Sequence, residues 1–251
     1  MSHSLLTNKT VLVTAAAGTG IGFATARRCA EEGAYVILSD RHERRLGEAA
    51  DRLTEVMGER PPTVVCDVTN QAQVEAMFKA AIGAKGHLDV LVNNAGLGGT
   101  SSLVEMTDES WARVMDVTLT GTMRCIREAF KHMLPRGKGA IVNNASVLGW
   151  RAQKGQSHYA AAKAGVMALT RCAGVEAAEY NVRVNAVAPS LAMHPFLHKV
   201  TSPELLRELE SKEAFGRAAT PDEIANVIVF LASDLSSYMA GEVVSVSSQR
   251  A

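Results

Sequence analysis

The segment Thr10-Val-Leu-Val-Thr-Ala-Ala-Ala-Gly-Thr-Gly-Ile-Gly22 carries the first structural signal. Its β-branched and apolar start predicts a buried strand over 10–14, and its small residues form a turn into a helical pattern over 20–32. Such a turn lets the backbone approach a pyrophosphate, and the helix N-terminus supplies free N–H groups. Because glycines permit any tight turn between strand and helix, this segment alone is a weak signal.

The alternation of strands and helices continues to the end of the chain. Further strands are predicted over 34–39, 63–66, 88–92, 140–144, 182–187 and 243–246. Helical patterns lie near 42–57, 70–84, 108–133, 157–179 and 221–232. Continuous apolar strands joined by helices favour an α/β fold, a Rossmann-type doubly wound parallel sheet of about seven strands with helices on both faces.

The domain organisation follows from where the alternation of strands and helices is interrupted. No internal repeat or polar linker divides the 251 residues, so we expect one domain over 1–251. Residues 190–215 form a long insertion between a strand and the last helix. A connection of that length with its own apolar residues is more often a lid than a plain connector, which predicts a substrate lid there.

Composition excludes several functional classes. The 26 basic and 26 acidic residues give zero net charge, which argues against a nucleic-acid partner. No apolar run approaches the roughly 20 residues that span a bilayer, and the start of the chain lacks the features of a secretion signal. The cysteines are far apart with no C-x-x-C pair, which argues against a disulfide scaffold or a zinc ribbon. We therefore expect a soluble, cytoplasmic protein without a membrane partner.

Asp40 ends the second predicted strand, 20 residues after Gly20. An acidic side chain at this distance from a phosphate turn accepts hydrogen bonds from an adenosine ribose. Asp40 could also be a helix N-cap, because Asp40-x-x-Glu43 fits a capping box, and the two roles are compatible. Arg41 could stack on adenine or meet a 2′-phosphate, but the Asp40 carboxylate would repel that phosphate. The pattern favours NAD over NADP as cofactor.

The most specific chemical signal is the set Ser146, Tyr159 and Lys163. Tyr159 and Lys163 are four residues apart and project from one helical face. This pair alone could be an ordinary surface pair, but Ser146 ends a predicted buried strand 13 residues before Tyr159. The combination favours an active site built from a strand end and the helix that follows it.

Several motifs occur along the chain in a fixed order: Thr14–Gly22, Asp67-Val68, Asn93-Asn94-Ala95-Gly96, Ser146, Tyr159-x-x-x-Lys163, Asn185–Pro189 and Gly216-Arg217…Pro221. With this ordered set the sequence resembles the short-chain dehydrogenase/reductase family, including its 3-oxoacyl-reductase-like and hydroxysteroid-dehydrogenase-like members. The resemblance implies a catalytic role for Ser146, Tyr159 and Lys163. It implies cofactor contacts for Gly18, Thr19, Gly20, Ile21, Asp40, Asp67, Val68, Asn94, Gly96, Tyr159, Lys163, Pro189 and Ala192.

The chemistry of these three side chains fits carbonyl reduction and its reverse. A ketone that accepts hydride develops charge on oxygen and needs a proton, which Tyr159 could donate. Because an unperturbed phenol has a pKa of about 10, we expect Lys163 and a cationic nicotinamide ring to lower the pKa of Tyr159. The resemblance also implies that Lys163 bonds the nicotinamide ribose. The Ser146 hydroxyl would hold the substrate oxygen.

The sequence departs from the family pattern in four places. The phosphate turn is one residue longer, with Ala15 in place of the first glycine, and the C-terminus reads Val246–Gln249 without the usual Asp-Gly-Gly. Thr118 stands where the family carries an asparagine that supports proton relay, and Asn144 could supply that amide or be a plain strand-end residue. The usual Pro-Gly and later threonine become Pro189-Ser190 and His194. Pro195 lies between His194 and His198 and no third ligand is apparent, so we expect no metal site.

The substrate is predicted to be a bulky apolar carbonyl compound or alcohol, of an acyl-thioester, alicyclic or steroid-like class. The apolar residues expected at the cleft are Leu97, Leu148, Trp150, Leu191, Met193, Phe196 and Leu197, although they could instead pack the loop onto the domain. The residues that could meet a carboxylate or a coenzyme A phosphate are Arg151, His194, His198 and Lys199. The alternative function is a nucleotide-binding regulatory or scaffold protein, but the intact set of three side chains favours an enzyme.

The helices over 108–133 and 157–180 carry small and apolar residues on more than one face. The 190–215 insertion could cover this surface in a monomer. In the family that the sequence resembles, these helices build one contact between subunits and the C-terminal strand builds a second. Two such contacts related by perpendicular two-folds imply a homotetramer, with a dimer if the altered C-terminus has lost its contact.

Overall fold

The computed structural model describes residues 4–193 and 202–248. They contain one parallel sheet in the order β3-β2-β1-β4-β5-β6-β7. The order reverses between β1 and β4, and ligands of such sheets bind at the carboxyl ends of the strands beside this reversal. The strands are β1 (Thr10–Val13), β2 (Tyr35–Asp40), β3 (Thr63–Val65), β4 (Val90–Asn93), β5 (Gly139–Asn144), β6 (Val182–Pro189) and β7 (Val243–Val246).

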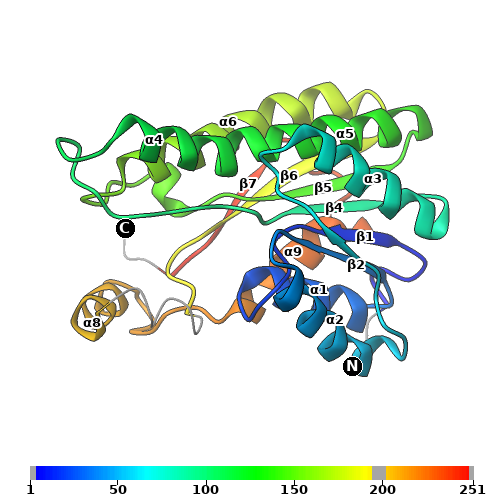
Figure 1. Cartoon of the computed structure of the whole chain (residues 1–251), viewed down its shortest axis with the longest axis horizontal. Coiled ribbons are helices and arrows are strands. Elements are labelled where there is room, and N and C mark those ends of the chain that lie inside the picture. Colours follow the sequence, from blue (N-terminus) through cyan, green and yellow to red (C-terminus); the bar gives the residue numbers. More distant parts are fainter. Residues whose placement is uncertain (1–3, 194–201, 249–251) are drawn as a thin grey trace.

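Helices cover both faces of this sheet (Figure 1). Helices α1, α2 and α9 lie on one face, and α3, α4, α5 and α6 lie on the other; α8 lies apart from both layers. None of the described helices is long and apolar enough to cross a membrane. The helices are α1 (Ile21–Glu31), α2 (Glu43–Met57), α3 (Gln71–Lys85), α4 (Asp108–Met115), α5 (Gly121–Arg136), α6 (Ser157–Ala178), α8 (Pro203–Ser211) and α9 (Pro221–Ala232).

The side chains of the central strands alternate between two cores. Val11 and Val13 of β1 pack into the core beneath α1, α2 and α9, whereas Leu12 packs into the core beneath α3, α5 and α6. All three are fully buried, as expected for a strand covered on both faces. The predicted doubly wound sheet of seven strands is confirmed.

One predicted helix contains a turn that the sequence did not predict. The helix predicted over 108–133 consists of α4, a π-helical turn at Asp116–Thr120, and α5, which continues to Arg136. A π-turn widens the helix by one residue, so the apolar period on either side does not reveal it. Gly121, the residue after this turn, packs closely against Val68, which follows β3. A Cβ on Gly121 would lie 2.6 Å from the Val68 Cγ2 atom. The other predicted ends agree with the structure to within two residues.

The two ends of the 190–215 insertion are connected by hydrogen bonds. The Ser190 hydroxyl donates to the Glu213 carboxylate at 3.1 Å, and the Met193 N–H donates to the Ala219 carbonyl at 2.8 Å. Between them lies α8, whose N-terminus is capped by the Ser202 side chain. The predicted cleft and rim residues within 194–201 are outside the described residues; they are His194, Phe196, Leu197, His198 and Lys199.

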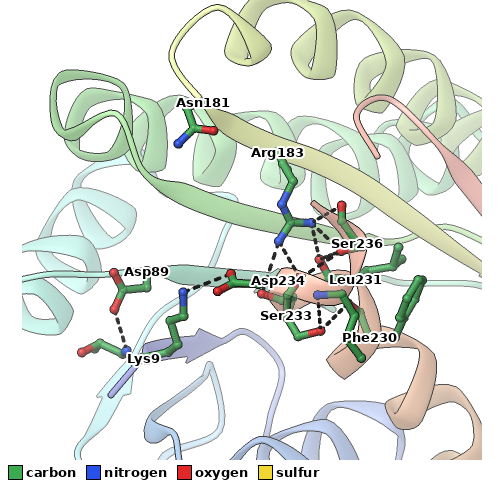
Figure 2. Close-up of polar contacts among 12 residues, drawn as sticks. Lys9, Asp89, Asn181, Arg183, Phe230, Leu231, Ser233, Asp234 and Ser236 are labelled. Carbon is green, nitrogen blue, oxygen red and sulfur yellow. Dashed lines mark hydrogen bonds and ion pairs between the residues drawn. The ribbon is translucent and has the colours of Figure 1, made fainter. Parts of the chain in front are cut away.

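Arg183 of β6 closes the C-terminal end of α9 (Figure 2). Its guanidinium donates to the carbonyls of Leu231 at 2.8 Å and Ser233 at 2.9 Å. It also donates to the hydroxyl and the carbonyl of Ser236. The last carbonyls of a helix have no partner within the helix and carry its negative dipole end, so the half-buried Arg183 cation stabilises the helix there.

Replacing Arg183 with methionine is expected to lower the free energy of unfolding by about 3 kcal/mol, because buried carbonyls would be left without donors. Urea denaturation measures this change. The control is Lys9→Met, which removes the exposed ion pair with Asp234 at 3.3 Å. The control should change the free energy of unfolding by less than about 1 kcal/mol. Equal effects of the two variants would contradict the capping role.

Candidate active site

The phosphate turn between β1 and α1 is held by very close backbone contacts. A Cβ on Gly22 would lie 2.3 Å from the Ala15 carbonyl oxygen and 2.5 Å from the Asn94 Nδ2 atom. The N-cap of α1 is Gly20, and no side chain caps its free N–H groups. Gly18 takes a positive φ of 119°, which glycine adopts readily. The turn therefore leaves the positive end of α1 available to an anion, and these residues fit a dinucleotide pyrophosphate.

Ala15, which replaces the first glycine of the family pattern, adopts a left-handed φ of 49°. For an alanine this conformation costs about 1–2 kcal/mol. The Asn94 Nδ2 group donates to its carbonyl at 3.1 Å, and the N–H of Ala16 donates to the Ser39 carbonyl at 3.0 Å. The longer turn thus keeps a glycine-like backbone at this position against a conformational penalty.

Asp40 is buried at the end of β2 and joins that strand to the phosphate turn. One carboxylate oxygen accepts from the Ala17 N–H at 3.2 Å and the other from the His42 N–H at 2.9 Å. The capping-box interpretation of Asp40 is wrong: the N-cap of α2 is His42, two residues further on, with no side-chain cap bond. Arg41 beside it is exposed. The structure therefore places a carboxylate next to the phosphate turn.

Asp67 and Val68 follow β3, next to β2 in the sheet. The Asp67 carboxylate accepts from the N–H of Thr69 at 2.9 Å and from its hydroxyl at 2.8 Å. Burial alone would raise the pKa of Asp67, but these bonds and the nearby charges of Arg41 and Arg113 lower it. Val68 is buried. Both residues thus lie at the carboxyl edge that also carries Asp40.

Ser146, Tyr159 and Lys163 come together beyond the carboxyl end of β5. Ser146 opens a short 3-10 turn and accepts from the Leu148 N–H at 3.2 Å. Helix α6 presents Tyr159 and Lys163 on one face, with the Lys163 Nζ atom 5.5 Å from the centre of the Tyr159 ring. Lys163 is 3% exposed and donates to the main-chain carbonyl of Asn144. The structure therefore gathers the three predicted side chains in one site.

Burial sets the electrostatics of this site. Burial raises the pKa of Tyr159, and a hydrogen bond with Ser146 opposes that rise. Burial lowers the pKa of Lys163 to about 8. The phenol and the amine are both buried, so the charged form of each is disfavoured. In the protein without cofactor, the pKa of Tyr159 is therefore raised; the expected lowering by Lys163 together with a cationic nicotinamide ring stays a prediction for the cofactor-bound protein.

Thr118 lies in the π-helical turn and is fully buried. Its hydroxyl accepts from the Leu97 N–H at 3.0 Å and donates to the Leu97 carbonyl at 3.1 Å. It thus fixes the loop after β4, in which a Cβ on Gly96 would lie 3.4 Å from the Lys163 Nζ atom. Sequence reasoning missed this contact because nothing in the spacing of 97 and 118 indicates it.

Asn94, predicted to line the cofactor, has an additional structural function. Its main-chain N–H donates to the Thr14 hydroxyl at 3.0 Å, and its side-chain oxygen accepts from the Asn144 amide at 2.9 Å. The neighbouring Asn93 donates to Asn143 at 2.9 Å within the sheet. Polar side chains at the ends of three adjacent strands therefore hold the phosphate turn and the Ser146 strand together.

The remaining predicted residues lie at the end of β6 and around the cleft. Pro189 is buried at the end of β6, and Ala192 forms a bridge with Ala219. Leu97, Leu148, Leu191 and Met193 are half-buried, whereas Trp150 and Arg151 are exposed. Within residues 4–193 and 202–248, no three His, Cys, Asp or Glu side chains are arranged to hold a metal ion.

Comparison with known proteins gives the family. A family model described as enoyl-(acyl carrier protein) reductase matches residues 15–248. A protein of Mycobacterium tuberculosis named (5R,7aS)-5-hydroxy-7a-methyl-1-oxo-2,3,5,6,7,7a-hexahydro-1H-indene-carboxyl-CoA reductase is 61% identical over 249 residues, 98% of this chain and 95% of its own length. Cis-4-hydroxycyclohexanecarboxylate dehydrogenase of Sinomonas cyclohexanicum is 40% identical over 240 residues, 94% of each chain.

Solved structures agree with this result. The crystal structure of a short chain dehydrogenase from Mycobacterium smegmatis matches with a TM-score of 0.88 at 58% identity, covering 100% of this chain and 96% of that one. Levodione reductase matches with a TM-score of 0.92 at 34% identity over 97% of each chain. With its Rossmann-type sheet and the cluster of Ser146, Tyr159 and Lys163, this chain belongs to the short-chain dehydrogenase/reductase family and is an oxidoreductase of secondary alcohols and ketones.

Proposed function

We propose that the chain is an NAD(H)-dependent oxidoreductase that interconverts a ketone and a secondary alcohol on a bulky apolar substrate. The observation that carries this proposal is the meeting of Ser146, Tyr159 and Lys163 beyond β5. We assign to them the catalytic roles. The proposed cofactor contacts are Gly18, Thr19, Gly20, Ile21, Asp40, Asp67, Val68, Asn94, Gly96, Tyr159, Lys163, Pro189 and Ala192.

The proposed roles of the three side chains follow from their chemistry. When bound, the cofactor supplies or accepts the hydride. The Ser146 hydroxyl donates to the substrate oxygen and stabilises the charge that develops there. The Tyr159 hydroxyl gives its proton to that oxygen in reduction and takes a proton back in oxidation. Lys163, in its ammonium form, favours the phenolate and bonds the ribose that carries the nicotinamide.

An alicyclic substrate that carries a carboxyl group as a coenzyme A thioester is the class we propose. Support comes from two relatives, which are named for an indene-carboxyl-CoA and for a hydroxycyclohexanecarboxylate. The apolar cleft residues are proposed to contact the rings; those described are Leu97, Leu148, Trp150, Leu191 and Met193. Arg151 is exposed next to Trp150 and could meet a phosphate of coenzyme A. The 190–215 insertion is proposed to be the lid over this cleft.

The substrate proposal can be tested by steady-state kinetics on matched compounds. Hydroxylated and oxo alicyclic carboxylates are compared as free acids and as coenzyme A thioesters, and nicotinamide absorbance is followed. We expect turnover of the ring compounds, with a higher kcat/KM for the thioesters than for the acids. Turnover confined to sugars or small polyols would contradict the proposed substrate class.

The choice of NAD over NADP gives a further prediction. NADH is expected to bind about tenfold or more tightly than NADPH, because the buried Asp40 carboxylate would lie near the 2′-phosphate and repel it. Replacing Asp40 with alanine should narrow or reverse this difference. Fluorescence titration of both cofactors against both proteins measures it. Tighter NADPH binding to the unchanged protein would overturn the prediction and assign Arg41 to the phosphate.

A homotetramer is the proposed assembly. A groove on the outer side of α5 and α6 supports it, since that surface has no covering element among the described residues and its lining is mainly apolar. The apolar lining residues are Met123, Ile126, Phe130, Leu134, Leu169 and Ala173. Light scattering coupled to gel filtration tests the assembly, and a mass near one 26.7 kDa chain would overturn both the tetramer and the dimer.

We also propose a single domain over 1–251 and a cytoplasmic location. The described strands form one continuous sheet, which supports the single domain. The four cysteines, Cys29, Cys66, Cys125 and Cys172, are all free thiols, which supports a reducing compartment.

A further inference from the structure

A directed chain of amide hydrogen bonds crosses the carboxyl ends of β1, β4 and β5. The Asn94 Nδ2 group donates to the Ala15 carbonyl at 3.1 Å, and the Asn94 Oδ1 atom accepts from the Asn144 Nδ2 group at 2.9 Å. The direction of this chain is fixed because a carbonyl can only accept. Asn94 must therefore present its nitrogen to Ala15 and its oxygen to Asn144, and Asn144 must present its nitrogen.

This direction leaves the Asn144 Oδ1 atom as the open end of the chain. The atom is buried and has no hydrogen-bond partner among the described residues. A buried acceptor without a donor costs about 1–3 kcal/mol, so an unpaired Oδ1 is unfavourable unless another state of the site supplies a donor. Asn144 lies two residues before Ser146, on the same face of the chain. The open acceptor therefore belongs to the same strand end as the active site.

The Lys163 ammonium is a donor that already reaches Asn144. It donates to the main-chain carbonyl of Asn144, and an ammonium has three N–H groups. The Thr118 hydroxyl both accepts from and donates to the main chain of Leu97, so its own hydrogen bonds are already made there. The groups that face Lys163 from the β4 loop and from the π-turn, Gly96 and Thr118, are uncharged, and Tyr159 is the titratable neighbour on its own helix.

We propose that Asn144 is a positioning residue for Lys163, an inference that rests on the proposed function. In the working site its main-chain carbonyl and its Oδ1 atom together accept from the Lys163 ammonium, and the amide chain through Asn94 fixes both acceptors relative to the phosphate turn. Two acceptors favour the charged form of a buried amine over the neutral form.

The test measures the pKa of Lys163 in the cofactor-free protein and needs no substrate. Lysine side chains are titrated by NMR, and the Lys163 signal is assigned with a Lys163→Arg variant. In Asn144→Leu, which removes the amide at similar volume, we expect the pKa of Lys163 to fall by about one unit. In Asn144→Asp, the carboxylate should raise the pKa of Lys163 above that of the unchanged protein, because it adds a negative charge next to the ammonium.

Opposite shifts in the two variants would support the positioning role, and they are independent of whether any substrate has been found. An unchanged Lys163 pKa in both variants would overturn it. A fall in both variants would also overturn it, because it would indicate that Asn144 acts only through the fold. Thermal unfolding is measured in parallel, and a cooperative transition in each variant shows that the pKa shifts are compared between folded proteins.

Discussion

Replacing Tyr159 with phenylalanine is expected to lower kcat by about 10³-fold or more in both directions. The phenol is the proposed proton donor and acceptor, and a positioned general acid or base contributes about 10²–10⁴-fold. The substitution removes one oxygen and keeps the ring, which packs beneath Gly98, where a Cβ would lie 3.5 Å from the Tyr159 Cδ2 atom. Steady-state kinetics with the best substrate from the alicyclic series measures this loss.

Cofactor binding separates loss of chemistry from loss of structure in this variant. The dissociation constant for NADH should stay within about fivefold of the unchanged protein, which corresponds to less than about 1 kcal/mol. Thermal unfolding should also be nearly unchanged. A Tyr159→Phe variant that keeps most of its kcat would contradict the proton-donor assignment. A variant that loses both binding and stability would show a structural role for the hydroxyl.

Replacing Gly22 with alanine is expected to abolish tight cofactor binding and to lower the free energy of unfolding by about 2–3 kcal/mol. The added Cβ would lie 2.3 Å from the Ala15 carbonyl and 2.5 Å from the Asn94 amide nitrogen, so the phosphate turn must move away from α1. That movement breaks the Asn94 bond that holds Ala15 in its left-handed conformation. Calorimetric titration with NADH and urea denaturation measure the two effects.

The control is Gly83→Ala, the same substitution in the last turn of α3. No atom lies within 4 Å of a Cβ at Gly83. This variant should bind NADH normally and gain up to about 1 kcal/mol of stability, because alanine favours a helix more than glycine does. Normal NADH binding by Gly22→Ala would contradict the prediction, because cofactor binding would then not depend on the close packing of the phosphate turn against α1.

The sheet could be predicted from the sequence because its signals are local. Val11, Leu12 and Val13 form a continuous apolar run, and such runs require cover on both faces. The glycine turn after β1 and the helical patterns between strands then fix a doubly wound order. The gathering of Ser146 with Tyr159 and Lys163 was predictable for a related reason, since a strand end and the start of the next helix meet at the carboxyl edge of the sheet.

Other features could not be predicted because they depend on contacts between distant segments. The π-turn around Thr118 arises where α4 and α5 meet the loop that holds Leu97. The capping box at Asp40 was a false signal because the carboxylate instead binds Ala17 in the phosphate turn. The raised pKa of Tyr159 depends on burial, which the four-residue spacing to Lys163 does not reveal.

Hydride transfer by this chain is tested most directly with deuterium-labelled cofactor. NADH labelled at the reactive nicotinamide carbon is incubated with the protein and an oxo alicyclic coenzyme A thioester, and the alcohol product is analysed by mass spectrometry. We expect a product with one deuterium on the carbinol carbon from one of the two labelled faces, and a rate lowered by Tyr159→Phe. An alcohol without deuterium from either labelled face, or no product from any ketone with NADH or NADPH, would contradict the proposed reaction.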